Sequence, residues 1–190
     1  QSRNWLQDPV GGIIWFGTDD TYSTCYIPMY CGITDTPVNV RQGNGSMIEY
    51  SSTSMFWITN LVTNFAYSRY CDMIVDIQKV QSRLENAFQE EVKQFDKDVE
   101  AVYVTDPAKA LTMMTEFSAE KTVETFNEWN KLFAYLAVKY IDGNVKVEKD
   151  GKFESTESGP RYPAWPNQPE YPEFWYRAII NDCGTNIIEH

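Results

Sequence analysis

Histidine is almost absent from this sequence: the 190 residues contain one, His190, at the last position. A Ser-His-Asp or Cys-His arrangement needs an imidazole that the fold holds in place, which we do not expect of a terminal residue. The sequence therefore predicts no catalytic triad within these residues. The four cysteines, Cys25, Cys31, Cys71 and Cys183, form no CxxC pair, so no zinc site or other metal site is predicted. We interpret them as small buried side chains, and a Cys25–Cys31 disulfide stays open.

Long apolar runs and excess positive charge are also missing. No stretch approaches the roughly 20 apolar residues that span a bilayer. The formal net charge is −11, which repels phosphate backbones and anionic membrane surfaces. We therefore predict no nucleic-acid partner, no membrane partner and no cofactor. The chain begins Gln1-Ser2-Arg3, without an initiator methionine or a signal peptide, so we expect a piece of a longer protein or a processed chain.

Hydrophobic residues make up 43% of the chain and aromatic residues 15%, enough for a sizeable core. We predict a single domain over residues 1–190. Its first part, 1–30, supplies sheet strands at about 12–17 and 21–30, with the turn GTDDT between them. Pro28 favours the end of a strand or an edge strand. Residues 31–52 form a loop of a length that is uncommon unless the loop has a function or is pinned.

Helices are predicted over residues 53–142. Ser52 or Thr53 would cap the first helix, which is apolar nearly all round and so should be deeply buried. A helix over 70–104 follows, because its apolar residues recur at spacings of three and four; its charged outer face is interpreted as solvated. Asp106-Pro107 starts a helix that runs to about Phe117. Another runs from about Ala119 to Ile141 and packs antiparallel to 70–104.

A hairpin is predicted over 145–155, with Asp150-Gly151 at its turn. Residues 159–184 then form a proline-rich strap and a last helix at about 172–182. The five prolines of GPRYPAWPNQPEYPEFWY recur every third residue, which favours polyproline II and places Tyr162, Trp165 and Tyr171 on one face. Large aromatic side chains more often cover a core than remain in solvent. We therefore favour a strap that covers the helices over a docking peptide.

Candidate functional residues are few and not specific to one reaction. Asp19-Asp20 is most simply a turn pair. Asn60 and Asn64 share one face of an apolar helix and must be hydrogen-bonded if they are buried. Arg3 has the geometry to bind a substrate carboxylate through two hydrogen bonds, although alone it fits an ordinary surface residue. Arg69 interrupts an apolar stretch and should pair with an acid.

Long stretches of the sequence resemble a known protein family, and this resemblance gives information that the spacing of residues does not. The runs SRNWLQDPVGGIIWFGTDDTYSTCYIPMYCGI and SMFWITNLVTNFAYSRYCDMIVDIQKVQSRLE resemble the C-terminal portion of the bacterial cysteine dipeptidases. KLFAYLAVKYIDGNVKVE and YPEFWYRAIINDCG fit as well, so the resemblance covers nearly all of the chain in order. These enzymes are N-terminal-nucleophile hydrolases and are related to the secernins. The resemblance implies an α+β fold, in which this chain is the C-terminal part of an αββα sandwich with a long antiparallel helical hairpin.

The resemblance also implies a mechanism. The family's nucleophile is a cysteine made N-terminal by processing, whose own α-amino group acts as the base, so neither histidine nor metal is needed. This chain starts with Gln1, and none of its cysteines falls at a matching position. We therefore expect no catalytic residue here, a nucleophile in a missing N-terminal half, and little activity of this chain alone.

Four residues are nominated for the substrate-binding pocket: Arg3, Trp15, Tyr30 and Asn60. The expected partners are dipeptide substrates, the missing half of the same protein and a second copy of the chain. Both an exported and a cytoplasmic bacterial location stay open. The alternative function is a non-catalytic, acidic helical module that binds a partner through the aromatic face of the strap.

Overall fold

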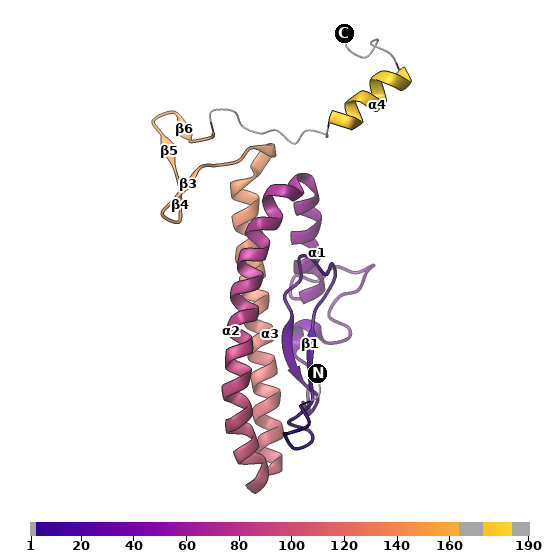
Figure 1. Cartoon of the computed structure of the whole chain (residues 1–190), viewed down its shortest axis with the longest axis vertical. Helices are drawn as coiled ribbons and strands as arrows, with labels where there is room; N and C mark the ends of the chain where they lie inside the picture. The colour runs from indigo at the N-terminus through magenta and orange to yellow at the C-terminus, as the bar shows by residue number, and fades with distance from the viewer. Residues whose placement is uncertain (1–2, 164–172, 184–190) are drawn as a thin grey trace. The chain divides into compact units, whose positions relative to one another are not determined.

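The computed structural model describes residues 3–163 and 173–183 (Figure 1). The chain divides into two compact units, Gln1–Val138 and Lys139–His190. Each unit is described below by itself. The described helices include none long and apolar enough to cross a membrane.

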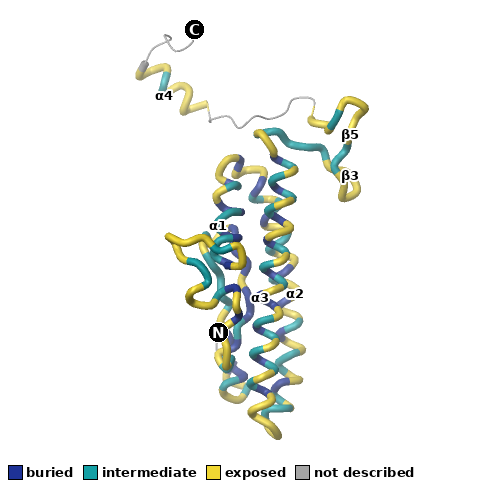
Figure 2. Tube along the Cα trace, turned by 180° about the vertical axis from the view of Figure 1, so that it is seen from behind, coloured by how far each residue is buried: buried dark blue, intermediate teal, exposed yellow. Residues whose placement is uncertain are grey.

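The first unit is built on two long helices, α2 (Tyr70–Thr105) and α3 (Pro107–Lys139), which lie side by side and antiparallel (Figures 1 and 2). At 1.5 Å per residue, the 36 residues of α2 extend about 54 Å. Asp106 separates the helices, and its Oδ1 accepts the N–H of Lys109 at 3.0 Å. Pro107 then stands at the first helical position, where its missing N–H costs nothing. The predicted hairpin and its Asp-Pro start are therefore confirmed.

The predicted break between Phe117 and Ala119 is wrong, because α3 is continuous there. Ser118, the residue between them, does not cap a new helix. Its side chain is fully buried, and its Oγ accepts the N–H of Tyr30 at 3.2 Å. The hydroxyl of Ser118 therefore makes a tertiary hydrogen bond to β2 while the helix continues past it.

Helix α1 (Met55–Ala66) follows Ser54, which occupies the N-cap position in place of the predicted Ser52 or Thr53. The turn η2 (Tyr67–Arg69) joins α1 to α2. The helix is buried along one face only, while Phe56, Trp57, Leu61 and Phe65 are half-buried. The expectation of burial all round is therefore not met. Arg69 pairs with Asp72 at 2.5 Å, as its place in an apolar stretch indicated.

Strands β1 (Ile13–Phe16) and β2 (Ile27–Tyr30) form an antiparallel pair in which Ile13 faces Tyr30 and Phe16 faces Ile27. The predicted second strand began at residue 21, but 21–26 are turn and coil. The N–H groups of Ser23 and Thr24 both bond to the carbonyl of Asp20, which turns the chain there. Pro28 lies inside β2 opposite Trp15. Each strand is an edge of this two-stranded sheet, as Pro28 suggested.

The core of this unit lies where the β-hairpin meets the half of the helical pair that is nearer to Asp106, the residue that joins α2 to α3. Its buried members are Val10, Ile13, Tyr30, Val92, Val99, Ala110 and Met114. Further along α2 and α3, Leu84, Phe88, Trp129 and Leu136 are also buried. The apolar spacing of 70–104 therefore identified the buried face of α2 correctly.

The second unit begins with the turn η3 (Ile141–Gly143) and two short hairpins. Strands β3 (Glu148–Lys149) and β4 (Lys152–Phe153) are joined by Asp150 and Gly151, with φ of 52° and 73°. Two successive positive φ values suit a tight hairpin turn, so the hairpin over 145–155 is confirmed. Strands β5 (Ser155–Thr156) and β6 (Gly159–Pro160) were not predicted.

Helix α4 (Glu173–Cys183) agrees with the predicted last helix. Pairing of Gly159–Pro160 with β5 means that the first residues of the proposed strap are in a hairpin. Tyr162 is exposed, whereas Trp165 and Tyr171 lie outside the described residues. That the strap covers the helices stays a prediction, and so does the αββα sandwich.

Candidate functional site

A groove of about 880 Å³ runs along α2, between this helix, the N-terminal segment and the β-hairpin. We call it the α2 groove. The residues that line it are Arg3, Trp5, Leu6, Trp15, Tyr26, Glu85, Gln89, Val92, Lys93, Asp96, Lys97 and Glu100. The α2 members recur at spacings of three and four, so they share one face of the helix. Two of the nominated residues, Arg3 and Trp15, therefore contribute to the same concave surface.

Arg3 holds one end of the α2 groove together. Its side chain is 5% exposed and forms an ion pair with Asp96 of α2. Its Nη2 also donates to the carbonyl of Val10 at 2.9 Å, and its Nε to the carbonyl of Gly11 at 3.4 Å. A Cβ at Gly11 would lie 2.8 Å from the carbonyl oxygen of Arg3, so glycine is required for this close approach. The arginine thus fixes the N-terminal segment against the helix.

Tyr30 lies beneath Arg3. Its hydroxyl donates to Oδ1 of Asp96 at 2.6 Å, and the Arg3 guanidinium stands 5.4 Å from its ring centre. Burial, followed by the bond to Asp96, raises the pKa of the Tyr30 hydroxyl above its ordinary value, so the group stays protonated and donates. Asp96 is thereby satisfied by two buried donors.

Glu85 marks the other end of the α2 groove. One of its oxygens accepts the backbone N–H of Tyr26 at 2.9 Å. Burial raises the pKa of the Glu85 carboxyl, and the hydrogen bond from Tyr26 opposes this shift only in part. Among the described residues, no lysine or arginine forms an ion pair with it. Glu85 is therefore a partly desolvated carboxylate that faces the groove.

Asn60, the fourth nominated residue, is not part of the α2 groove. Its amide donates to both carboxylate oxygens of Asp19, at 3.2 and 3.3 Å. Asn64 in turn donates to Oδ1 of Asn60 at 2.7 Å. The structure thus joins Asn60 and Asn64 with the Asp19 turn, in an exposed network apart from Arg3, Trp15 and Tyr30.

Sequence reasoning missed Glu85 and Asp96, which it assigned to a solvated face of α2. Asp96 is 14% exposed. Glu91, which was also assigned to the solvated face, pairs with the buried Lys121 of α3. A signal was present, because 85, 89, 92, 96 and 100 follow one another at helical spacing. That polar stripe contains Val92, an apolar residue that an uncovered face would not need.

The cysteines differ in their surroundings. Cys25 is buried, and burial raises the pKa of its thiol to about 12. Cys31 and Cys71 are exposed, so the interpretation of all cysteines as buried side chains is wrong for these two. Cys25 and Cys31 are free thiols, so they form no disulfide here.

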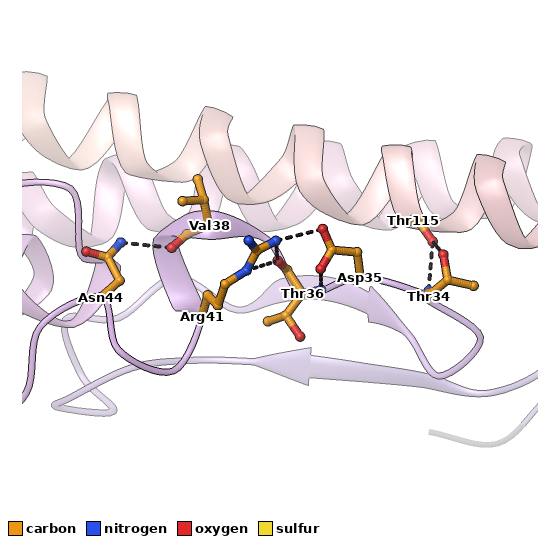
Figure 3. Close-up of polar contacts among 7 residues, drawn as sticks. All are labelled: Thr34, Asp35, Thr36, Val38, Arg41, Asn44 and Thr115. Atoms are coloured by element: carbon orange, nitrogen blue, oxygen red, sulfur yellow. Dashed lines mark hydrogen bonds and ion pairs between the residues drawn. The ribbon is translucent and has the colours of Figure 1, made fainter.

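The long loop is pinned by polar contacts (Figure 3). Arg41 bonds to the carboxylate of Asp35 at 2.6 Å and to the carbonyl of Thr36 at 2.8 Å. Thr34 attaches the loop to α3, because its N–H donates to Oγ1 of Thr115 at 2.9 Å. A short turn, η1 (Val38–Val40), lies within it. The expectation that a loop of this length needs pinning is confirmed.

No group of three or more histidine, cysteine, aspartate or glutamate side chains able to hold a metal ion occurs in the described part of the chain.

Comparison with known proteins places the chain near one class of enzyme. Residues 1–83, which include the β-hairpin, α1 and the start of α2, match the model of peptidase family C69. The chain is also 28% identical, over 129 residues, to a protein named probable dipeptidase B from Lactococcus lactis subsp. lactis (strain IL1403). These matches confirm the resemblance to the dipeptidase family.

That alignment covers 67% of this chain and 26% of the Lactococcus protein. The chain thus matches about a quarter of its relative's length. The place of this chain in a C-terminal portion stays a prediction.

Proposed function

We propose that this chain is the C-terminal portion of a cysteine dipeptidase, which hydrolyses the peptide bond of dipeptides. The family match over residues 1–83 carries the proposal. The nucleophile is a cysteine outside these 190 residues, with its own α-amino group as base. Its sulfur attacks the carbonyl carbon, the second amino acid leaves as an amine, and water hydrolyses the resulting thioester.

The surroundings of the cysteines support a nucleophile elsewhere. Cys25 is buried, and its raised pKa keeps it a thiol at neutral pH. Cys31 and Cys71 have no histidine beside them among the described residues, since the sole histidine is His190. The role of this chain is then to supply part of the substrate-binding surface, for which the α2 groove is the best formed candidate.

The test is to trap the nucleophile in the native protein isolated from its source. The protein is assayed for amino-acid release from a panel of dipeptides, treated with iodoacetamide, and mapped by mass spectrometry. We expect hydrolysis to stop when a cysteine outside this chain becomes alkylated. Loss of activity that tracks alkylation of Cys25, Cys31, Cys71 or Cys183 would overturn the proposal, as would a native protein that cleaves no dipeptide.

Two cysteine variants test whether the exposed thiols of this chain are needed for activity. Cys31→Ser and Cys71→Ser remove the two exposed thiols of this chain, and both are expected to retain full dipeptidase activity. The alternative, a non-catalytic module that binds through the strap, stays a prediction because Trp165 and Tyr171 lie outside the described residues.

A further inference from the structure

We propose that the α2 groove binds a dipeptide by its two charged ends, with Glu85 receiving the ammonium group and Lys93 the carboxylate. This inference rests on the proposed dipeptidase function and names the contacts at which the substrate is held. Both residues line the groove on α2.

The spacing of the two charges fits a dipeptide. Glu85 and Lys93 are eight residues apart on one helix, which is about 12 Å along its axis. An extended dipeptide spans about 7 Å, and an ion-pair contact of about 3 Å at each end brings the total to about 13 Å. A tripeptide adds roughly 3.5 Å and overshoots Lys93, while a single amino acid does not reach both ends.

Glu85 is suited to an ammonium group because its environment leaves it undersatisfied. It lies on the same face of α2 as Asp96, yet their surroundings differ. Asp96 accepts from Arg3 and Tyr30, whereas the contact recorded for Glu85 is one backbone N–H, from Tyr26. A partly buried carboxylate with no cation gains most from a charged donor that arrives with the ligand. Of the two, Glu85 is therefore the residue with capacity to bind.

Lys93 is suited to the other end because its present partner is easily given up. It pairs with Glu90 at 2.6 Å, and the two side chains are 65% and 73% exposed. Exposed ion pairs contribute little to stability, so Lys93 can turn toward a ligand at little cost. Arg3 is less available, since it already bonds to Asp96 and to two backbone carbonyls.

The rest of the lining suits the body of a short peptide. Gln89 lies between Glu85 and Lys93 on the helix and offers both a donor and an acceptor to a peptide group. Trp15, Leu6 and Val92 give an apolar wall for its side chains. Three cations and three carboxylates line the groove (Arg3, Lys93 and Lys97; Glu85, Asp96 and Glu100). This balance favours a zwitterion over a strongly charged ligand.

The experiment measures binding to the full chain by titration calorimetry. The probes are Leu-Leu, N-acetyl-Leu-Leu, Leu-Leu amide and tri-leucine, so each charged end is removed without altering the protein. We expect saturable binding of Leu-Leu and at least tenfold weaker binding of the other three. Equal affinity for all four, or no binding of Leu-Leu, would overturn the inference.

Variants then assign the ends. Glu85→Gln should weaken binding of Leu-Leu at least tenfold and leave binding of N-acetyl-Leu-Leu unchanged. Lys93→Met should weaken binding of Leu-Leu at least tenfold and leave binding of Leu-Leu amide unchanged. Asp98→Asn is the matched control, because Asp98 bonds to Gln94 and does not line the groove, and it should bind like the parent. If both variants lose all probes equally, the assignment of ends is wrong.

Failure of this inference differs from failure of the proposed function. Native enzyme that hydrolyses dipeptides, with KM unchanged by Glu85→Gln and Lys93→Met, would reject the groove contacts and keep the dipeptidase. If the protein binds Leu-Leu through both charged ends but hydrolyses no dipeptide, the groove contacts are kept and the dipeptidase function is rejected.

Discussion

Replacing Tyr30 with phenylalanine removes one buried oxygen, the hydroxyl that bonds to Asp96, and leaves the ring in place. The ring packs against Phe95 and Phe117, with centroids 5.4 and 5.9 Å away, and these contacts survive the substitution. The lost interaction is the hydrogen bond to Asp96 at 2.6 Å. Asp96 then depends on Arg3 alone.

The size of the effect follows from the burial and charge of this contact. Tyr30 is 1% exposed, so water does not replace the lost donor. Hydrogen bonds to charged groups contribute about 1.5–3 kcal/mol, and we expect the free energy of unfolding to fall by about 2 kcal/mol. With an m value of about 2 kcal/mol/M, the urea midpoint falls by about 1 M.

The assay is equilibrium urea unfolding followed by tryptophan fluorescence. Tyr22→Phe is the matched control, because Tyr22 is 65% exposed and its loss should change stability by less than about 0.5 kcal/mol. The m value should stay the same in all three proteins. A Tyr30→Phe protein as stable as the control would refute the role assigned to the Arg3–Asp96–Tyr30 contacts.

Two further predictions concern titratable groups. The folded-state pKa of Glu85 is raised, so its ionisation opposes folding; this effect is absent below the unfolded pKa of about 4.3 and complete above the folded pKa. Glu85→Gln should therefore be more stable than the parent at pH 7, and urea unfolding at acid pH should show no difference between them. A stability difference that stays constant with pH would contradict the raised pKa of Glu85. In the native state Cys31 and Cys71 should react with a thiol reagent before Cys25, whose thiol is buried with a pKa near 12; peptide mapping that finds Cys25 labelled as fast as Cys31 would contradict this burial.

Local patterns determined much of the fold. The apolar spacing along 70–104 located the buried face of α2, because a helix repeats every 3.6 residues whatever it packs against. Asp150-Gly151 located a hairpin turn, because the turn needs two residues that tolerate positive φ. In both cases the information lies within the segment itself.

The errors arose where a side chain bonds to a distant segment. A break was expected between helices ending at about Phe117 and starting at about Ala119, but the helix continues there and the hydroxyl of Ser118 accepts the N–H of Tyr30. Residues 21–26 were assigned to a strand, but the N–H groups of Ser23 and Thr24 bond to the carbonyl of Asp20, and the N–H of Tyr26 bonds to the side chain of Glu85 on α2. None of these partners is visible in the periodicity of the segment concerned.

The residues of the candidate site likewise include some that the sequence predicted and some that it missed. Arg3, Trp15 and Tyr30 were nominated by residue type and resemblance, and the structure brings them together. Glu85 and Asp96 were assigned to solvent because charged residues on a helix are usually exposed. Their burial depends on residues 3–30 docking against α2, a contact between segments more than 50 positions apart, such as Tyr26 with Glu85.

Two carboxylates of the α2 groove, Asp96 and Glu85, differ in their surroundings, although they lie on one face of the same helix. Asp96 accepts from Arg3 and Tyr30, so its charge is met by the chain and stabilises the docked N-terminal segment. Glu85 is partly desolvated without a cation, so its charge reduces the stability of the free protein. Groups that oppose folding are characteristic of functional sites, where a ligand supplies the missing partner. This contrast is the physical reason why we propose ligand binding for Glu85 and a structural role for Asp96.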